Sequence, residues 1–267
     1  MRVIVVNGMP RSGTSWLGQI FDSSPSTKFK LEPLFSYRFK DYVGLSSTKE
    51  EWEIFFDEVY KTEDEFMDQI ERKINGKYPR FNKKDNNPSF LIMKYTRYHN
   101  LTNRLLELFS NIKIVHIVRN PCGMINSWLK SKGEFPSNAN PLEEWKSAQC
   151  RKTAPEEFWG FNDWVSLTQM YIELQAKYPN NVKVISYDEL VLNPIDIIKE
   201  TFSFTGIELT GQTIEFLQAS QSTHDSDQYA VFKNKNVKDS WKHELDINIR
   251  SEIIEAVRQL NLEKYLI

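Results

Sequence analysis

The opening of the chain constrains its fold most, because a buried strand, a tight turn and a helix are predicted there in direct succession. Residues 3–6 are four consecutive β-branched apolar residues, a run typical of a strand buried on both faces within a parallel sheet. The strand ends at Gly8, and the spacing of apolar side chains in 16–21 predicts a helix. This order predicts an α/β fold with a central, mostly parallel sheet flanked by helices.

The turn after this strand has the glycine spacing of a P-loop. Four residues separate Gly8 from Gly13, and Thr14 and Ser15 follow. Glycines at this spacing let the backbone turn tightly, so that several N–H groups and the helix N-terminus point at one anion. Nucleotide triphosphatases carry a lysine where this chain has Thr14, whereas the positive charge here is Arg11, inside the loop. We therefore expect a phosphate-binding loop whose reaction does not depend on a P-loop lysine.

Composition narrows the class of protein. The chain has 267 residues, with 34 Lys plus Arg and 36 Asp plus Glu, so it lacks the overall basic charge of a nucleic-acid binder. Cys122 and Cys150 are too few for a disulfide framework or a zinc site. No apolar run approaches about eighteen residues, and no charged leader precedes the first strand. We expect one soluble, cytoplasmic domain, 1–267, that binds neither nucleic acid nor a membrane.

A carboxylate is predicted close to the phosphate loop. Residues 28–35 form a short extended segment in which Pro33 follows Glu32, and proline biases the preceding residue to extended geometry. In a doubly wound sheet this strand ends near the edge where ligands bind. Residues 90–95 predict another buried strand, with Lys94 at its end. Glu32 is thus a candidate base, and the alternative is a solvated loop glutamate.

A helical segment interrupts the predicted strands. Residues 50–74 are acidic and carry aromatic and aliphatic side chains at helical spacing, and 75–89 is a polar stretch with glycine and prolines that predicts a loop. We expect 45–89 to be an insertion or lid over the sheet edge. No repeat or low-complexity linker argues for a second domain.

Another predicted strand is followed directly by a positively charged residue. Residues 112–118 are apolar enough for a buried strand, Arg119 follows, and a helix that contains Ser127 begins after Pro121. A kinase or ATPase commonly carries Asp at this point to organise Mg²⁺. Arg119 therefore indicates a second anion in place of a metal. His116 lies in mid-strand, so we expect it in the core.

Two motifs carry a family resemblance. The first is Pro-Arg-Ser-Gly-Thr-Ser-Trp at 10–16, and the second is Val-Arg-Asn-Pro at 118–121, with Ser127 eight residues after its arginine. Together they resemble the 5′-phosphosulfate loop and the 3′-phosphate element of sulfotransferases that use 3′-phosphoadenosine 5′-phosphosulfate (PAPS). The resemblance implies a P-loop NTPase-like sulfotransferase fold and PAPS as co-substrate, with no metal because arginine and lysine neutralise the phosphates.

The resemblance extends to two later segments. Residues 184–190 are similar to the strand whose tyrosine lies near the adenine, and 232–245 are similar to a basic loop that closes over the 3′-phosphate. The tryptophan of the first motif is expected either to stack on adenine or to pack in the core. The residues that the resemblance assigns to nucleotide binding are Arg11, Ser12, Gly13, Thr14, Ser15, Trp16, Arg119, Ser127, Tyr187, Lys233 and Lys235.

The expected base distinguishes two branches of the family. In the cytosolic phenol and steroid branch a catalytic histidine stands two residues after the strand-end lysine, where this chain has Thr96. Residues 32–34, Glu-Pro-Leu, instead resemble the carbohydrate branch, in which a glutamate near this point is implicated as base. His99 stays an alternative. The catalytic candidates are Glu32, Arg11, Lys94 and His99.

The sequence thus predicts an enzyme that transfers the sulfuryl group of PAPS in line to a hydroxyl or amine of a small-molecule or carbohydrate acceptor. Two alternatives remain: a P-loop kinase of a small molecule, and a non-catalytic nucleotide-binding module. The aromatic segment 155–161 is expected to line the acceptor pocket or, more commonly for such residues, to pack in the core. The sequence leaves open a monomer or a homodimer.

Overall fold

The chain folds around a five-stranded sheet in which every neighbouring pair of strands is parallel. The computed structural model describes residues 1–222, 231 and 239–266. The strand order is β2-β3-β1-β4-β5, with β1 in the centre. The α/β class and the parallel sheet predicted from the sequence are therefore confirmed. The strands are β1 (Arg2–Gly8), β2 (Thr27–Leu31), β3 (Phe90–Tyr95), β4 (Lys113–Val118) and β5 (Val182–Ser186).

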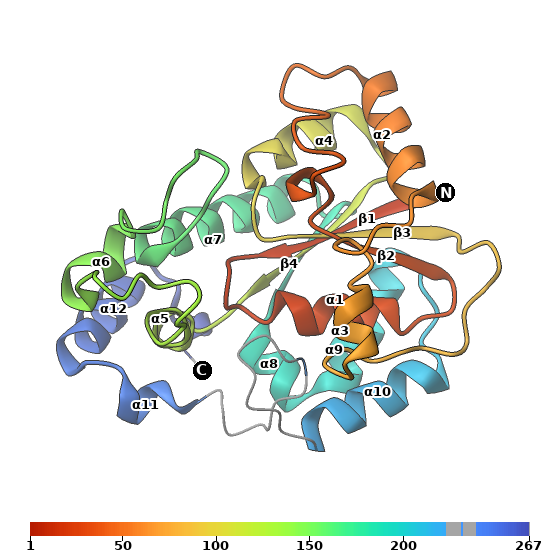
Figure 1. Cartoon of the computed structure of the whole chain (residues 1–267). Helices are drawn as coiled ribbons and strands as arrows, with labels where there is room; N and C mark the ends of the chain where they lie inside the picture. Colours follow the sequence, from red (N-terminus) through yellow and green to blue (C-terminus); the bar gives the residue numbers. More distant parts are fainter. Residues whose placement is uncertain (223–230, 232–238, 267) are drawn as a thin grey trace.

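Helices cover both faces of the sheet (Figure 1). The α-helices of the described residues are α1 (Thr14–Asp22), α2 (Lys49–Lys61), α3 (Ile70–Ile74), α4 (Thr102–Leu108), α5 (Pro121–Leu129), α6 (Pro141–Ser147), α7 (Gly160–Lys177), α8 (Tyr187–Leu192), α9 (Pro194–Thr205), α10 (Gly211–Ser222), α11 (Trp241–Glu244) and α12 (Ile247–Gln259). None of them is both long and apolar enough to span a membrane.

The alternation of side chains along β1 divides the core into two layers. Val5 packs on one face with apolar residues of α2, α4 and α7, whereas Ile4 and Val6 pack on the other face with α1, α8, α9 and α10. All three side chains are nearly or fully buried. A strand with both faces covered needs apolar residues at successive positions, which explains the β-branched run in its sequence.

The topology brings several loops to one edge of the sheet. Since all strands are parallel, the segments that leave β1, β3, β4 and β5 start at the same edge. From β1 the chain runs past the position of β3 to β2, and from β3 it runs past β1 to β4, on the opposite side of β1. The order of the strands therefore reverses direction beside β1. Helices α5, α6, α11 and α12 lie beyond this edge (Figure 1). Ligands bind at such switch points in open α/β sheets.

The segment between β2 and β3 contains two helices, α2 and α3. Helix α2 begins with a capping box, in which the Thr48 hydroxyl accepts from the Glu51 backbone and the Glu51 carboxylate accepts from the Thr48 N–H. Its Trp52 and Phe55 are buried in the same core layer as β1 Val5. The function of 45–89 as a lid stays a prediction.

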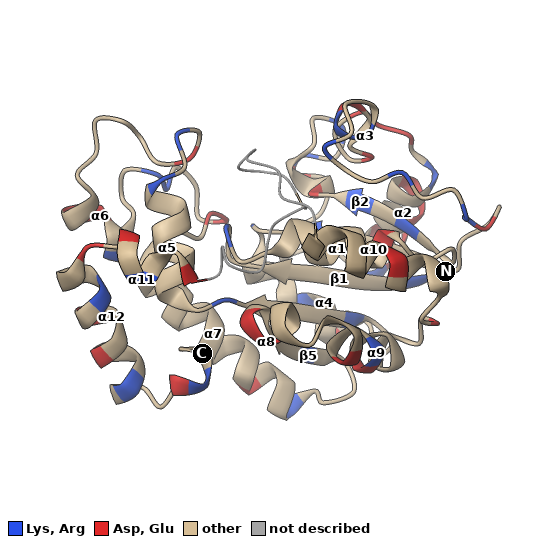
Figure 2. Ribbon diagram, turned by 90° about the horizontal axis from the view of Figure 1, so that it is seen from below, with Lys and Arg blue, Asp and Glu red and all other residues tan. Residues whose placement is uncertain are grey.

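Some helices carry residues of both charges. Acidic and basic positions are interspersed along the ribbon of α12 (Figure 2). Helix α2, in contrast, is mainly acidic, so the near-balance of 34 basic and 36 acidic residues in the sequence does not hold for every helix.

Candidate functional site

The P-loop-like turn joins β1 to α1, and the surroundings of Gly8 and Gly13 leave no space for a side chain at either position. Gly13 has a φ of 85°, and a Cβ placed on it would lie 2.4 Å from Cδ2 of Tyr187. A Cβ on Gly8 would lie 2.6 Å from the carbonyl oxygen of Ile117 on the neighbouring strand. A side chain at either position would therefore displace the loop or the groups behind it.

The start of α1 has no side-chain cap, and a buried hydroxyl next to it has no partner among the described residues. Gly13 occupies the N-cap position of α1, where it offers no side-chain cap, and the first turn of the helix carries no acidic residue. The hydroxyl of Ser12 is buried and has no hydrogen-bond partner among the described residues. Free N–H groups at a helix N-terminus together with an unpaired hydroxyl form an arrangement suited to an anion. Thr14 is buried and Ser15 is partly exposed in this first turn.

The two sequence motifs meet at Arg11. Its Nε donates to Oγ of Ser127 on α5 over 3.1 Å, and its Nη1 lies 3.5 Å from Oε2 of Glu134. The backbone of Arg11 is in the left-handed region, with a φ of 67°, a conformation that a non-glycine residue rarely adopts. This contact places the cation of the first motif beside the hydroxyl of the second.

Arg119 lies against the same loop. Its Nη1 donates to the carbonyl of Arg11 over 2.8 Å, and its guanidinium lies 4.9 Å from the centre of the Tyr187 ring. Its Nε is buried and has no hydrogen-bond partner among the described residues. Burial raises the pKa of Tyr187, and the charge of Arg119 opposes part of that rise. A buried guanidinium with a spare donor is a fitting partner for a second anion.

Glu32 lies at the end of β2, next to the end of β3. Its Oε1 accepts from the backbone N–H of Thr96 over 2.7 Å and from the Thr96 hydroxyl over 2.6 Å. The Nζ of Lys94 is farther away, 3.4 Å from the same oxygen. The side chains of Glu32 and Lys94 are only 5% and 7% exposed, so the predicted solvated loop glutamate is wrong.

His99 belongs to a polar cluster in the interior. Its Nδ1 lies 2.9 Å from the hydroxyl of Tyr171, which also contacts the side chains of Asn7 and Thr102. Burial lowers the pKa of His99 to about 3, against an opposing effect of the Gly8 and Thr96 backbones. The Nδ1 of His99 thus faces a core tyrosine, while its buried Nε2 has no hydrogen-bond partner among the described residues.

His116 is in the same cluster, as its mid-strand position predicts. Its ring is stacked on Tyr171 at 3.6 Å between centroids, and its Nδ1 lies 2.8 Å from Oδ1 of Asn7. Burial lowers its pKa well below the usual histidine value.

The remaining nucleotide candidates divide between the core and the region outside the described residues. Trp16 is buried and its Nε1 donates to the hydroxyl of Ser220 over 2.9 Å, while its ring meets the Tyr187 ring edge-on at 6.2 Å. Of the two expected positions, core packing therefore describes most of this side chain. Lys233 and Lys235 lie outside the described residues.

A second buried carboxylate, that of Glu157, pairs with Arg97, the residue that follows Thr96 in the sequence. The Arg97 guanidinium lies 4.1 Å from the centre of the Phe35 ring, and its Nη2 donates to Glu157 over 3.3 Å. In the segment 155–161, Trp159 and Phe161 are buried in the core, the commoner outcome that the sequence allowed. Glu134 was not identified from the sequence, because it belongs to no motif.

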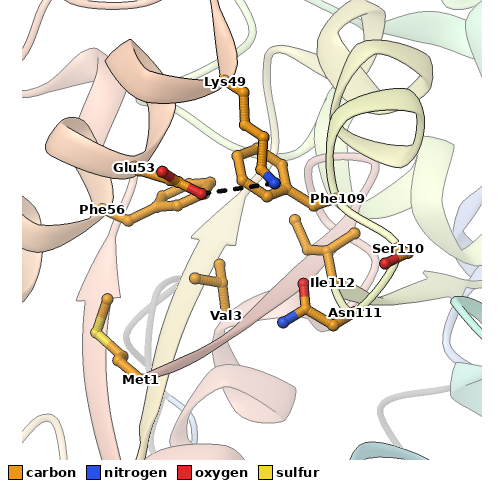
Figure 3. Close-up of a pocket in the computed structure, with 9 residues that line it drawn as sticks. All are labelled: Met1, Val3, Lys49, Glu53, Phe56, Phe109, Ser110, Asn111 and Ile112. Carbon is orange, nitrogen blue, oxygen red and sulfur yellow. Dashed lines mark ion pairs between the residues drawn. The ribbon is translucent and has the colours of Figure 1, made fainter.

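A hollow of about 470 Å³ opens at the other end of β1, away from these residues (Figure 3). Its lining comes from the amino end of β1, from α2 and from the segment between α4 and β4. None of the predicted site residues belongs to it. The lining residues are Met1, Val3, Lys49, Glu53, Phe56, Phe109, Ser110, Asn111 and Ile112. Within the described part of the chain, no group of three or more His, Cys, Asp or Glu is placed to hold a metal ion.

Comparison with known proteins identifies the family. The family model of the sulfotransferase domain matches residues 2–264, so the chain belongs to the sulfotransferase family. The family predicted from the two motifs is thereby confirmed, and with it the class of enzyme, one that transfers a sulfuryl group. No curated protein matches the sequence.

Solved sulfotransferase structures share the fold at low sequence identity. A mouse sulfotransferase, SULT7A1 complexed with PAP, is 18% identical with a TM-score of 0.55, over 99% of this chain and 88% of that one. A sulfotransferase from Alicyclobacillus acidocaldarius is 15% identical with a TM-score of 0.53, over 100% and 96% of the two chains. A sulfotransferase domain from the curacin biosynthetic pathway is 16% identical with a TM-score of 0.51, over 97% of each chain.

Proposed function

We propose that this chain transfers the sulfuryl group of PAPS to a hydroxyl or amine of a small-molecule or carbohydrate acceptor, without a metal ion. The observation that carries the proposal is the meeting of the two motifs, in which Arg11 contacts Ser127 and Arg119 contacts the Arg11 backbone. A nucleotide with phosphates at both its 5′ and 3′ positions needs two anion sites held at a fixed separation. PAP in the solved mouse relative is such a nucleotide.

The residues of the loop fit the 5′-phosphate. Arg11, the Ser12 hydroxyl and the free N–H groups at the start of α1 would stabilise the negative charge that develops on the departing phosphate. Arg119 and Ser127 would hold the 3′-phosphate, and the Tyr187 ring would border the adenine. Lys233 and Lys235 are proposed for the same nucleotide from the family resemblance alone.

Glu32 is proposed as the general base, with Lys94 contacting the sulfuryl oxygens. The carboxylate is buried and fixed at the edge where ligands bind, which suits a group that must meet the acceptor in one orientation. His99 is the weaker candidate, because its Nδ1 is engaged by Tyr171 and burial disfavours its protonated form. A P-loop kinase would need a lysine at position 14 and an acidic residue near position 119, where this chain has Thr14 and Arg119.

The proposal is tested by binding and by turnover. Calorimetric titration with PAP, in buffer with Mg²⁺ and again with EDTA, should give the same affinity. Turnover of PAPS should then be measured with p-nitrophenol, ethanolamine, glucosamine and cellobiose, which sample a phenol, an amino alcohol, an amino sugar and a disaccharide. Strict dependence of binding or turnover on the metal would refute the metal-free proposal and favour a kinase.

A further inference from the structure

The two oxygens of the Glu32 carboxylate have unequal surroundings. Oε1 accepts two short hydrogen bonds from Thr96 and lies near the Lys94 ammonium. Oε2 is buried and has no hydrogen-bond partner among the described residues. A buried carboxylate oxygen without a donor is costly, so its presence at the end of β2 needs an explanation.

The backbone of Glu32 holds the side chain in this orientation. Its φ is 42°, in the left-handed region, so the extended geometry expected before Pro33 is wrong, and its N–H donates to the Lys94 carbonyl over 2.8 Å. Pro33 follows and begins a short 3₁₀ helix, whose first bonds are accepted by the Glu32 carbonyl. Such a conformation in a non-glycine residue is uncommon and is found often at functional sites.

A second glutamate in the chain shows what a fully paired version of this arrangement looks like. Oε2 of Glu157 accepts from the backbone N–H and the hydroxyl of Thr153, over 2.8 and 2.9 Å. Its other oxygen is paired as well, with Arg97 at 3.3 Å and Arg151 at 3.8 Å. Glu157 therefore has donors on both oxygens, whereas Glu32 has them on one only.

We propose that Thr96 is a positioning residue for proton transfer: it holds Oε1 of Glu32, so that Oε2 is the atom that accepts the proton of the acceptor. The inference rests on the proposed function. Oε1 already faces two Thr96 donors and the Lys94 ammonium, and the backbone N–H among them cannot turn away. A proton on Oε1 would therefore displace an existing donor, while a proton on Oε2 displaces none among the described residues.

The step then balances as follows. The O–H or N–H proton of the acceptor passes to Oε2, and the acceptor oxygen or nitrogen forms its bond to the sulfur of PAPS. The bond between that sulfur and the 5′-phosphate oxygen breaks, and its electron pair stays on the phosphate. The proton leaves Oε2 for solvent before the next turnover.

The experiment compares Thr96→Val, which removes the hydroxyl and keeps the backbone N–H, with Thr96→Ser, which keeps both donors. Thr153→Val is the matched control, because it removes the same kind of hydroxyl from the fully paired glutamate. Glu32→Gln tests the base itself. Turnover of PAPS is followed with the fastest acceptor of the panel, and also without acceptor, as release of sulfate to water. PAP affinity is measured by calorimetry for each variant.

Thr96→Val should lower kcat by about tenfold or more, the effect of one hydrogen bond to a charged group, with PAP affinity unchanged. The acid limb of its pH–kcat profile should move to higher pH, since a carboxylate that loses a donor holds its proton more tightly. Thr96→Ser should restore both quantities, and Thr153→Val should change neither.

Two results would overturn the inference, and they are distinguishable. A Thr96→Val enzyme with normal turnover and a normal pH profile, beside an inactive Glu32→Gln enzyme, would leave the base in place and remove the role of Thr96. Normal turnover in Glu32→Gln would remove the proposed base itself. If Thr96→Val does not fold, an active Thr96→Ser with a displaced pH profile would equally contradict the proposal.

Discussion

The two sides of β1 differ in charge and in what their polar groups lack. Towards β4 and β5 lie two arginines, of which Arg119 has a buried Nε without a partner in the described residues. Towards β3 and β2 lies Glu32, with a buried oxygen in the same condition. We call these the nucleotide side and the carboxylate side. The nucleotide side has a donor without an acceptor, and the carboxylate side has an acceptor without a donor. This pair fits a reaction that leaves negative charge on the nucleotide side and a proton on the carboxylate side.

The largest expected effect is on the carboxylate side. Glu32→Gln keeps the shape of the side chain and loses its basicity, so kcat should fall by about 10²–10⁴-fold, roughly 3–5 kcal/mol of barrier. PAP affinity should stay nearly constant, because the nucleotide side is unchanged. His99→Asn should cost much less. Steady-state kinetics on both variants check this, and near-normal turnover of Glu32→Gln with an inactive His99→Asn would reverse the assignment.

The next effect is expected on the nucleotide side. Arg119→Ala should weaken PAP binding by about 1.5–3 kcal/mol, the loss of a charge-assisted hydrogen bond. Binding of adenosine 5′-phosphosulfate, which has no 3′-phosphate, should change far less. Ser127→Ala should show the same preference. Calorimetry with the two nucleotides measures the difference, and equal losses for both would mean that neither residue contacts the 3′-phosphate.

The nucleotide side has local signals in the sequence, whereas the contact between Glu32 and Thr96 on the carboxylate side has none. The β-branched run before Gly8, the glycine spacing and the cation that follows β4 all occur within single short segments. On the other side, Thr96 lies 64 residues from Glu32, and only the β2–β3 pairing brings them together. Pairing of distant strands is a tertiary property that a single-sequence pattern does not carry.

Helix boundaries depend on similar contacts. Helix α6 ends at Ser147 because Ala148 adopts a left-handed φ of 53°. Gly160 packs against this turn, where a Cβ on it would meet the Lys146 carbonyl at 2.6 Å. The α2–α3 break follows from the buried Lys30, whose Nζ contacts the Thr62 carbonyl and Asp68 between the two helices. Each boundary depends on a contact between segments far apart in sequence.

A third prediction concerns the stability of the fold, at a residue that belongs to neither the nucleotide side nor the carboxylate side. Asp22, at the end of α1, pairs with Lys84 at 2.9 Å and Lys73 at 3.1 Å. Burial opposes its ionisation, but the two lysines outweigh burial and the pKa of Asp22 is lowered. Its contribution is therefore present above the unfolded pKa of about 3.9 and is lost as pH falls through the lower folded value.

Asp22→Asn should thus lower the free energy of unfolding by about 1–2 kcal/mol at neutral pH. The gap between variant and wild type should close as the pH falls below about 4. Urea denaturation across this pH range checks the direction in which the gap changes, and Asp57→Asn, at an exposed position of α2, is the control. A gap that widens on acidification would contradict the assignment. PAP affinity should be unchanged at neutral pH.

The smallest effect concerns a carboxylate in contact with Arg11 on the nucleotide side, Glu134, whose Oε2 lies 3.5 Å from Nη1 of Arg11. A phosphate bound by Arg11 would have to compete with this charge. Glu134→Gln removes the charge and retains the shape, so PAP should bind more tightly by about 0.3–1 kcal/mol, the usual value of a partly exposed ion pair, with kcat nearly unchanged. Glu143→Gln, on the surface of α6, is the control. The gain should shrink at high salt, because screening weakens the competing attraction. If calorimetry instead shows weaker PAP binding in Glu134→Gln, Glu134 orients Arg11 for the phosphate, and the nucleotide side depends on a carboxylate of its own.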